Sequence, residues 1–594
     1  MNATGLRDIY CGQVNASNIG QKVNLCGWVS KIRDHGEHLV FVDLRDHTGI
    51  VQCVVEAKLN LKPEYVLRVT GTVFNRPEDT FNDRIATGEV EIKNCEIQIL
   101  NTAETLPIPI DPKINVEETQ RLKYRFIDIR SDRMQYNLRL RHRILESIRQ
   151  SMSAMGFLEV DTPLLWMPTP EGAREFLVPS RLQKGQFYSL PQSPQIAKQL
   201  LMVAGIDRYF QIAKCLRDED LRSDRQFEFT QLDLEASFVK ENDIMDFVSK
   251  VIKSLYEDVF NTSIDDIPKM TWIEAMYLYG TDKPDLRIPV VITDLSQLFE
   301  NTNVNALKGH STQGLILKGG SLISRTKLDE LVEIAKRGGA KGLLWLRVTE
   351  DATGIVFDSP VSKFFQDEDR ESLKKGLDPE PGDLILIVSD EKLLACKVLN
   401  TVLSKVISDN LIDIKLDQAD HRYVWITDFP MFESVDESNN AVAAHHPFTM
   451  PNIEDLDLIT KDPLKVRSSA YDLVLNGWEL GSGSVRIHDR SIQETVFKAL
   501  GLTIQEAYER FGFMLEAFKY GAPPHAGFGL GIDRLVAILA NESSIREVIA
   551  FPKSQSGIDL MTLSPSQVPA ISLKELGIQL VKDSKNEGKN EVKQ

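Results

Sequence analysis

Residues 217–225 combine side chains that could bind a nucleotide. Three arginines alternate with four carboxylates between two strand-like segments, 209–213 and 227–235. Arginine binds phosphate oxygens in a bidentate manner and carboxylates hold metal ions, so this mixture suits a nucleoside triphosphate with its metal ions. The simpler interpretation is a solvated hairpin tip, where charged side chains are ordinary. The segment alone leaves both interpretations open.

The strand that follows this loop favours the binding interpretation. Alternation along a strand places Gln231, Asp233 and Glu235 on one face, with Leu232 and Leu234 on the other. Three polar side chains that face the same way beside an arginine-rich loop predict the floor of a site.

A second carboxylate pair lies in a predicted hairpin at residues 471–480. The Asn476-Gly477 turn is a strong hairpin signal, and it sets Val474 opposite Glu479. Asp472 then becomes the diagonal neighbour of Glu479, roughly 7–8 Å away across the strands. Two such carboxylates suit Mg²⁺ bound to triphosphate oxygens. The alternative is an exposed polar face, but the apolar neighbours on both strands make unpaired acids costly there, which favours the metal site.

Arg486 completes this group only if the strand contains an irregularity. It follows Glu479 by seven residues, so simple alternation puts the two side chains on opposite faces. The intervening residues 481–484 have the sequence GSGS, and glycines inside a strand often mark a bulge or a close approach of a ligand. We therefore expect a bulge that returns Arg486 to the site.

Residues 527–534 contain three alternating glycines followed by Arg534. A dinucleotide-binding loop would need a preceding βα unit, whereas residues 521–525 predict a loop. An arginine at a helix start, beside exposed backbone amides, suits a terminal phosphate.

Length and composition limit the classes of protein to which these segments can belong. A chain of 594 residues is too long for one hydrophobic core, so several domains are expected. No apolar run is long enough to span a bilayer, and the polar start does not resemble a signal peptide. Six scattered cysteines without a Cys-x-x-Cys pair make a disulfide framework or a cysteine-ligated zinc site unexpected and favour a reducing cytoplasm. The net charge of −17 argues against non-specific coating of nucleic acid but allows specific binding.

The first 105 residues predict a small β-barrel. Five short strand-like segments in about 100 residues match an oligonucleotide-binding barrel (OB-fold). Its nucleic-acid face would carry Arg33, Phe41 and Gln52, because bases stack on rings and bond to side-chain amides. For Phe41 taken alone, core filling is the stronger interpretation.

The rest of the chain predicts a larger α+β body with an insertion. Three prolines within residues 106–112 indicate a stiff linker. Residues 121–149 hold nine basic against three acidic side chains, which fits either a phosphate-facing surface or a solvated helix face. Between about 287 and 420, strand and helix patterns alternate like those of a separate α+β domain.

Taken in order, these segments resemble those of bacterial-type aspartyl-tRNA synthetases over essentially the whole chain. Residues 158–163, the loop at Arg217 and residues 527–534 resemble the three class II signatures, the first of which builds a dimer interface. The segments that resemble the aspartyl family more specifically are 169–174 (TPEGAR), 191–200 (PQSPQIAKQL), 445–449 (HHPFT) and 481–486 (GSGSVR). Residues 357–364 (FDSPVSKF) resemble the bacterial branch.

The resemblance implies a multidomain α+β fold with a five-stranded OB-fold barrel, an antiparallel-sheet catalytic domain of class II type and an inserted α+β domain. The expected divisions are the anticodon-binding barrel at 1–105, a hinge at 106–135, the catalytic domain at 136–286 and 421–562, the insertion at 287–420, and a C-terminal extension at 563–594 with a disordered end.

The implied reaction joins L-aspartate to tRNA with ATP and Mg²⁺, through aspartyl-adenylate and with release of pyrophosphate and AMP. The resemblance assigns aspartate binding to Glu171, Ser193, Gln195, Lys198, Arg217, Asp233, His445 and Arg486. It assigns ATP binding to Arg217, Asp218, Glu219, Arg225, Gln226, Phe229, Glu479, Gly531, Ile532, Asp533 and Arg534. Asp472 and Glu479 would hold Mg²⁺, and Arg33, His35, Phe41, Gln52 and Asp79 would face the anticodon.

Two features depart from the family pattern. Phe227 stands where the second signature usually has proline. The loop at residues 33–38 is one residue longer than usual and carries His35 where strict enzymes often have leucine, and Asp79 replaces a frequent basic residue. These anticodon-loop changes predict that the enzyme charges asparagine tRNA as well as aspartate tRNA.

The rival assignments are asparaginyl- or lysyl-tRNA synthetase and an RNA-binding paralogue without catalysis. The group of Gln195, Lys198 and Arg486 favours an anionic side chain, and the intact charged residues of the signatures speak against an inactive paralogue. The resemblance further implies a cytoplasmic homodimer that does not bind membranes.

Overall fold

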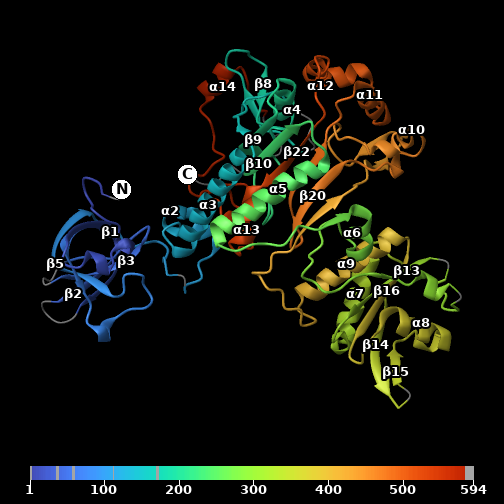
Figure 1. Cartoon of the computed structure of the whole chain (residues 1–594), viewed down its shortest axis with the longest axis horizontal. Helices are drawn as coiled ribbons and strands as arrows, with labels where there is room; N and C mark the ends of the chain where they lie inside the picture. The colour runs from blue at the N-terminus through green and yellow to red at the C-terminus, as the bar shows by residue number, and fades with distance from the viewer. Residues whose placement is uncertain are drawn as a thin grey trace, which may run out of the picture. The chain divides into compact units, whose positions relative to one another are not determined.

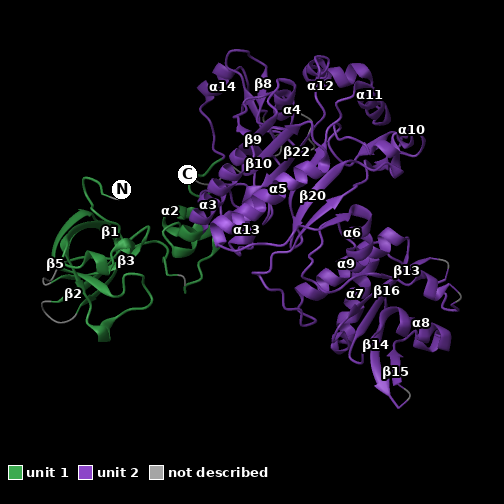
Figure 2. Ribbon diagram, viewed as in Figure 1, with its two compact units in different colours: residues 1–136, 559–564 green, residues 137–558, 565–594 purple. Residues whose placement is uncertain are grey.

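The computed structural model describes residues 3–34, 39–55, 60–111, 113–168, 173–300, 302–308, 310–352 and 354–581. Its elements run from the N-terminal barrel to the short C-terminal helix in Figure 1. The chain forms two compact units, residues 1–136 with 559–564 and residues 137–558 with 565–594 (Figure 2). The expected disordered end lies beyond residue 581, outside the described residues.

The first unit contains a closed barrel of five strands, as the sequence predicted. The strands are β1 (Lys22–Asp34), β2 (Val40–Asp46), β3 (Gly49–Val55), β4 (Val66–Asn75) and β5 (Val90–Asn101), in the order β1-β2-β3-β5-β4. Buried and exposed positions alternate along β1, β2 and β4, because one face of each strand fills the barrel. The described residues after the barrel include the short helices α1 (Glu118–Lys123) and α2 (Arg125–Asp128).

The second unit is built on an eight-stranded sheet. In spatial order the strands are β11 (Lys269–Thr271), β17 (Tyr423–Thr427), β20 (Ala470–Leu475), β21 (Trp478–Val485), β22 (His525–Gly531), β10 (Glu228–Ser237), β9 (Arg208–Leu216) and β6 (Leu158–Glu159). The central pairs are antiparallel, and the outermost pair at each edge is parallel. The edge strand β6 contains only two residues.

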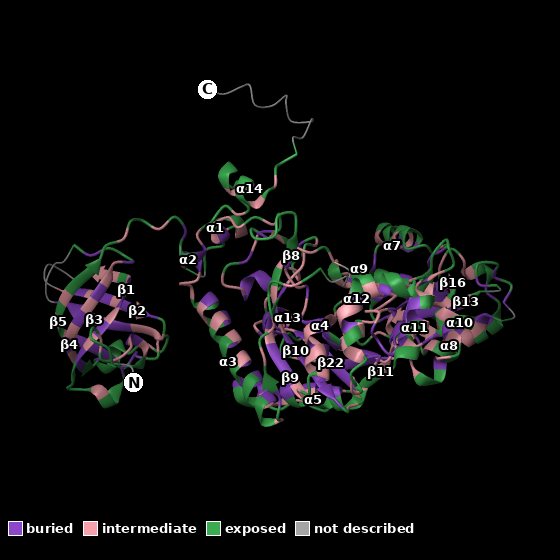
Figure 3. Cartoon of the chain, turned by 90° about the horizontal axis from the view of Figure 1, so that it is seen from above, coloured by how far each residue is buried: buried purple, intermediate pink, exposed green. Residues whose placement is uncertain are grey.

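The two faces of this sheet differ in chemistry. Apolar residues of the central strands pack against α5 (Glu241–Leu255), α13 (Ile532–Leu539) and the C-terminal part of α3 (Asp132–Ala154) in one large core. The opposite face carries Gln231, Asp233 and Glu235, as strand alternation predicted, with α4 (Gln195–Val203) beside it. Figure 3 shows β9 and β10 as mainly buried, whereas α14 (Ala570–Leu576) is exposed.

Glycines allow the central strands to approach one another closely. A Cβ atom on Gly481 or Gly483 would collide with backbone oxygens of β22 and with the Phe528 ring. A Cβ atom on Gly527 would collide with the Glu235 carboxylate. The glycine-rich segment 527–531 is thus a central strand rather than a loop, and α13 begins directly after it.

The inserted region forms its own five-stranded sheet, in the order β12 (Thr293–Asp294), β13 (Ser311–Leu317), β16 (Leu384–Asp390), β14 (Leu344–Asp351) and β15 (Gly354–Asp358). One face packs against α7 (Arg325–Arg337) and α9 (Lys392–Ser408), and the other against α8 (Asp367–Leu377). This is the expected α+β arrangement. The boundaries at 287 and 420 stay a prediction, because this sheet belongs to the same compact unit as the larger sheet.

The basic segment 121–149 contains arginines that form ion pairs within the protein, and its role as a phosphate-facing surface stays a prediction. Arg125 pairs with Asp128 inside the first unit. Arg141 pairs with Asp533, and Arg149 with Glu159, inside the second. These arginines are engaged in internal ion pairs.

The remaining helices of the second unit are α6 (Trp272–Tyr279), α10 (Leu458–Lys461), α11 (Arg490–Ala499) and α12 (Ile504–Phe518), and its short strands include β7 (Leu177–Pro179), β8 (Phe187–Ser189), β18 (Phe432–Val435) and β19 (Ala441–Ala443). None of the helices formed by the described residues is long and apolar enough to cross a membrane.

Candidate active site

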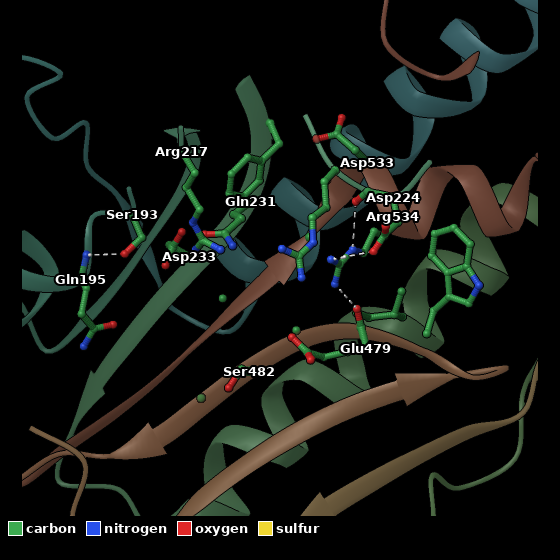
Figure 4. Close-up of a pocket in the computed structure, with 18 of the residues that line it drawn as sticks. Ser193, Gln195, Arg217, Asp224, Gln231, Asp233, Glu479, Ser482, Asp533 and Arg534 are labelled. Atoms are coloured by element: carbon green, nitrogen blue, oxygen red, sulfur yellow. Dashed lines mark hydrogen bonds and ion pairs between the residues drawn. The ribbon is translucent and has the colours of Figure 1, made fainter. Parts of the chain in front are cut away.

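A polar cavity of about 600 Å³ opens on the face of the large sheet that lies opposite the helical core. Its walls come from α4, β10, β21, the start of α13 and the loop 217–226, which are distant in sequence. Predicted site residues that line it are Ser193, Gln195, Lys198, Arg217, Glu219, Arg225, Gln226, Phe229, Asp233, His445, Glu479, Gly531, Asp533, Arg534 and Arg486. Figure 4 draws 18 of the lining residues as sticks and labels ten of them.

One end of the cavity holds four buried charges that neutralise one another; we call this set the carboxylate-reading cluster: Lys198, Asp233, Glu235 and Arg486. The Lys198 ammonium lies 3.1 Å from the Asp233 carboxylate and 3.4 Å from that of Glu235. The Arg486 guanidinium lies 2.9 Å from Glu235. All four side chains are almost fully buried, so each charge depends on its partners.

Arg486 reaches this cluster through a β-bulge. Val474 pairs with Glu479 but Leu473 pairs with Gly481, so Leu480 is the extra residue. The expected bulge therefore exists, one residue before the glycines. Its effect is to turn Arg486 towards the face that carries Glu235, where its Nη1 also donates to the Ser484 hydroxyl at 2.7 Å.

The pKa directions show how the cluster divides its charge. Burial raises the pKa of Asp233, and the attraction of Lys198 only partly opposes it. Burial also acts to raise the pKa of Glu235, but Arg486 and Lys198 outweigh it and the pKa is lowered. Burial acts to lower the pKa of Arg486, and Glu235 more than compensates. Glu235 and Arg486 thus form the firmly ionised pair, and one oxygen of Asp233 (Oδ2) has no hydrogen-bond partner among the described residues.

The other end of the cavity, which we call the nucleotide end, carries charges with fewer internal partners. The Arg217 guanidinium lies over the Phe229 ring at 4.9 Å, and its buried Nε has no hydrogen-bond partner within the described part of the chain. Arg225 pairs with Glu219 at 3.0 Å. Arg534 donates to the backbone oxygen of Glu479 at 2.8 Å and pairs with Asp224 (Figure 4).

The predicted metal carboxylates lie under this end. The Asn476-Gly477 turn joins β20 to β21 as expected, and Asp472 and Glu479 influence one another's ionisation. Burial raises the pKa of Asp472 well above its ordinary value, with the Glu479 charge adding to the effect. Burial acts to raise the pKa of Glu479 too, but the Lys283 ammonium, 2.9 Å away, lowers it.

Two adjacent histidines line the wall between the two ends. Burial lowers the pKa of His445, whose ring packs edge-on against Phe429. Burial, and then the charges of Arg486 and Lys198, lower the pKa of His446 to about 3. Both rings are neutral near pH 7, and the Nε2 atom of each lacks a hydrogen-bond partner within the described residues.

Three of the residues predicted to bind the nucleotide make other contacts than this role implies. Asp218 borders a neighbouring cavity rather than this one, and its backbone N–H donates to the Arg174 carbonyl. The Ile532 side chain lies in the helical core, which leaves only its backbone near the site. The Asp533 carboxylate accepts from the Thr230 backbone at 2.6 Å and pairs with Arg141, so it ties the helix to the sheet. Glu171 lies outside the described residues.

On the barrel, Arg33 and Gln52 lie together. Arg33 donates to Asp43 at 2.7 Å and to Gln52 at 2.9 Å, and Gln52 donates to Glu91 at 2.9 Å. Phe41 is partly buried, pairs across the strands with Arg33 and is not among the described residues of the barrel core. Its place at the anticodon stays a prediction. Asp79 is exposed in a short 3-10 turn, and His35 lies outside the described residues.

Several lining residues were given no binding role of their own from the sequence: Gln231, Asp224, Ser482, His446 and Lys283. The same holds for Glu235, which pairs with Lys198. The alternation of β10 already placed Gln231 and Glu235 on the correct face, and His446 adjoins a predicted residue. Lys283 had no such signal, because it lies on a segment almost 200 residues before its partner Glu479.

Family models match both parts of the chain. Residues 117–555 match the tRNA synthetases of class II (D, K and N), and residues 23–100 match the OB-fold nucleic acid binding domain. The described residues hold no group of three or more histidine, cysteine or acidic side chains placed to bind a metal.

Curated relatives extend over almost the whole chain. A protein named aspartate–tRNA(Asp/Asn) ligase from Caldanaerobacter subterraneus is 47% identical over 591 residues, covering 97% of this chain and 98% of its own. Proteins of the same name from a Geobacillus species and from Aquifex aeolicus are 46% and 45% identical, with similar coverage.

Solved structures share the fold at low identity. The asparaginyl-tRNA synthetase of Pyrococcus horikoshii, complexed with asparaginyl-adenylate, matches with a TM-score of 0.56 and 19% identity, covering 92% of this chain and 98% of the other. A putative aspartyl-tRNA synthetase from Leishmania major matches with a TM-score of 0.57 and 18% identity, covering 93% and 94%. These likenesses show the fold alone.

Proposed function

Since this chain belongs to the class II tRNA synthetases grouped as D, K and N, we propose that it activates L-aspartate with ATP and transfers it to tRNA. The relatives of 45–47% identity carry the name aspartate–tRNA(Asp/Asn) ligase, which supports both the amino acid and the broader tRNA range predicted from the sequence. The divisions at 1–105, 106–135, 136–286, 287–420, 421–562 and 563–594 are part of this proposal.

The observation that carries the choice of amino acid is the pair of buried cations, Lys198 and Arg486. A side-chain carboxylate that enters beside them gains charge-assisted hydrogen bonds in a site shielded from water. A lysine side chain would instead meet two like charges, which disfavours it strongly. Asparagine offers a neutral amide, so it forgoes the ionic attraction.

In the first step, the α-carboxylate of aspartate attacks the α-phosphorus of ATP. The new O–P bond forms as the bond to the bridging oxygen breaks, and pyrophosphate leaves. The protein supplies no covalent nucleophile, so the rate depends on positioning and charge neutralisation. Arg217, whose guanidinium lies over the Phe229 ring, would bridge the carboxylate and the α-phosphate, and Phe229 would stack on adenine.

In the second step, a terminal ribose hydroxyl of the tRNA attacks the carbonyl carbon of the adenylate. The ester bond forms, the carbonyl–phosphate bond breaks, and AMP leaves. For the first step, Glu219, Arg225 and Gln226 would hold ATP and Arg534 its γ-phosphate, which leaves with pyrophosphate before the tRNA reacts. Ser193, Gln195, Asp233 and His445 would shape the amino-acid pocket, with Glu171 assigned by resemblance alone.

The carboxylates of Asp472 and Glu479 fit a Mg²⁺ ion. Asp472 Oδ1 is buried and has no hydrogen-bond partner within the described residues. Burial disfavours the charged carboxylate, and a cation bound there would compensate its charge. When bound, Mg²⁺ neutralises the polyphosphate and orients it for in-line displacement. The protein's own contribution is to hold the two carboxylates on one hairpin.

We propose that the barrel face around Arg33, Phe41 and Gln52 reads the anticodon. An arginine, an amide and an aromatic ring are side chains that can bind unstacked bases. The aspartate and asparagine anticodons differ at one base, and one good base contact is worth only about 1–3 kcal/mol, so loop changes such as His35 and Asp79 can relax the choice.

The proposal includes a cytoplasmic homodimer. Beside the edge strand β6, Leu158, Leu164 and Leu165 are each about half exposed, at 53%, 50% and 52%. Apolar side chains grouped on an edge favour association with a second copy.

An ATP–pyrophosphate exchange assay with aspartate, asparagine and lysine tests the amino acid. Exchange with aspartate alone is expected; exchange with either rival, or none, contradicts the proposal. Aspartylation of purified aspartate and asparagine tRNAs, side by side, tests the tRNA range. A roughly thousand-fold preference for aspartate tRNA exceeds what one base contact explains and would mean that the enzyme is strict.

A further inference from the structure

Lys283 is the one cation of the cavity that comes from the segment leading into the inserted sheet, as far as the described lining residues show. Its ammonium lies 2.9 Å from Glu479 Oε2, and the two side chains are 42% and 29% exposed. The pair therefore sits at the cavity wall, open to a ligand, rather than in the core.

Both ends of the insertion lie beside the hairpin turn that precedes Glu479. On the entry side, a Cβ atom at Gly477 of this turn would come within 3.6 Å of the Asp285 side chain and 3.9 Å of the Lys283 carbonyl, so the two segments lie close together. On the exit side, the Asn476 amide donates to the Asp420 carbonyl at 2.9 Å.

The two sides of the insertion are also joined directly. Asp285 pairs with Arg287 at 2.7 Å, and Arg287 donates to the Asp417 carbonyl at 3.0 Å. The turn that carries Glu479 is thus braced by the two chain segments through which the inserted sheet connects to the larger one.

Lys283 and Arg534 both contact Glu479. Arg534 donates to its backbone oxygen and Lys283 pairs with its carboxylate. Asp472 Oδ1, on the other strand of the same hairpin, lacks a hydrogen-bond partner in the described structure. Of the two metal carboxylates, that of Glu479 therefore pairs with an ammonium, whereas one oxygen of Asp472 stays unpaired.

This arrangement conflicts with a divalent cation at the same carboxylates. A cation beside Glu479 would repel an ammonium that stays within about 3 Å of it. The polyphosphate that would arrive with the metal offers another anionic partner, since Lys283 and Arg534 both line the cavity and both contact Glu479. Because the lysine side chain is flexible, its ammonium can move a short distance towards that negative charge.

We propose that Lys283 is the resident counter-cation of Glu479 in the nucleotide-free protein and becomes a ligand of the terminal phosphates when Mg–ATP binds. The proposal rests on the proposed function, because it assumes that this end of the cavity takes a magnesium nucleotide. It adds a nucleotide-binding residue to the site and gives the inserted region a role in placing it.

The test measures two affinities that should change in opposite directions. In Lys283→Met the competing cation is gone, so Mn²⁺ alone should bind the nucleotide-free full-length protein roughly ten-fold more tightly, measured by electron paramagnetic resonance. The same variant should bind Mg–ATP roughly ten-fold more weakly by calorimetry, because a phosphate contact is lost.

Two further variants serve as controls. Lys283→Arg keeps the charge and should retain both affinities within about three-fold. Lys253→Met removes a lysine from the exposed pair with Asp266 on α5, away from the cavity, and should change neither.

Loss of both affinities in Lys283→Met, with a lowered melting temperature, would mean that the pair only supports the fold. Unchanged affinities would mean that Lys283 takes no part in binding. Either result overturns the proposal while exchange by the wild-type protein still stands. A wild-type protein that binds neither Mg–ATP nor aspartate would instead overturn the proposed function and this inference with it.

Discussion

The two ends of the cavity handle charge in different ways. In the carboxylate-reading cluster, each of the four charges has an opposite charge within 3.4 Å, and all are almost fully buried. At the nucleotide end, the Arg217 Nε and Asp472 Oδ1 atoms have no hydrogen-bond partner within the described residues, and Glu479 is satisfied by a lysine at the cavity wall.

This difference fits what each end would bind. A small substrate with one side-chain carboxylate can be selected only by groups that already stand in position, since little binding energy is available to rearrange them. A metal nucleotide brings several charges of both signs, so its end of the cavity can leave groups unpaired until it arrives. In this proposal, the carboxylate-reading cluster selects the substrate with groups that are already in position. The nucleotide end accommodates the charges that the metal nucleotide brings.

The largest effect is expected at the carboxylate-reading cluster. Arg486→Leu removes the partner of a fully buried carboxylate, Glu235, and should lower the free energy of unfolding by about 3–5 kcal/mol as well as abolish aspartate activation. The double variant Arg486→Leu/Glu235→Leu removes both charges and should recover most of the stability, but not the activity. Denaturant unfolding and exchange assays separate the two losses. Near-native exchange by either variant would contradict the assignment of Arg486.

At the nucleotide end, Asp472→Asn should separate stability from activity. Burial disfavours the charged Asp472 carboxylate, so a neutral amide should leave the free energy of unfolding unchanged or raise it by about 1 kcal/mol. Exchange should fall about 100-fold, with a weaker Mg²⁺ dependence, because an amide is a poorer ligand for a hard cation.

The matched variant Glu479→Gln should weaken the Mg²⁺ dependence too, but it should lose stability, because it leaves Lys283 without its carboxylate. If the Mg²⁺ titrations of both variants match that of the wild-type enzyme, the hairpin does not bind the metal.

His446, which lines the cavity wall, should make the free energy of unfolding depend on pH. Its pKa is about 3 in the folded protein against an ordinary value of 6.5, so the unfolded chain takes up a proton first as the pH falls. Its contribution to stability is therefore complete above pH 6.5 and is lost as the pH falls towards 3, by at most about 1.4 kcal/mol per pH unit. In His446→Gln, the dependence of unfolding on pH between 6.5 and 4 should be shallower. Identical slopes would show that the ring is not held neutral.

The smallest effect is expected at Phe227, which directly follows the loop 217–226 and lies outside the cavity. Its ring packs edge-on against Phe176, 5.5 Å between centroids, where the family usually has proline. Phe227→Ala should lose about 0.5–1.5 kcal/mol from that ring pair, beyond the loss of buried area. It should raise the KM for ATP a few-fold and leave the KM for aspartate unchanged. An equal rise in both would show that the two ends are not independent.

Much of this arrangement could be predicted from local patterns in the sequence. Alternation placed Gln231, Asp233 and Glu235 on one face, and the Asn476-Gly477 turn fixed the pairing of Val474 with Glu479. Such features depend on residues that are neighbours along the chain, where the period of a strand or the conformation of a turn dictates the geometry. The five barrel strands belong to the same class of prediction.

Only the tertiary structure decided which charges meet. Glu235 and Arg486 are 251 positions apart, and their ion pair depends on the bulge at Leu480 and on the absence of a side chain at Gly527. Lys283 reaches Glu479 because the inserted region leaves and rejoins the larger sheet beside the same hairpin turn. The sequence by itself determined the types of charge and the faces that carry them, because periodicity is local. Their pairing required the fold, since burial and distance between remote segments decide which buried ions are compensated.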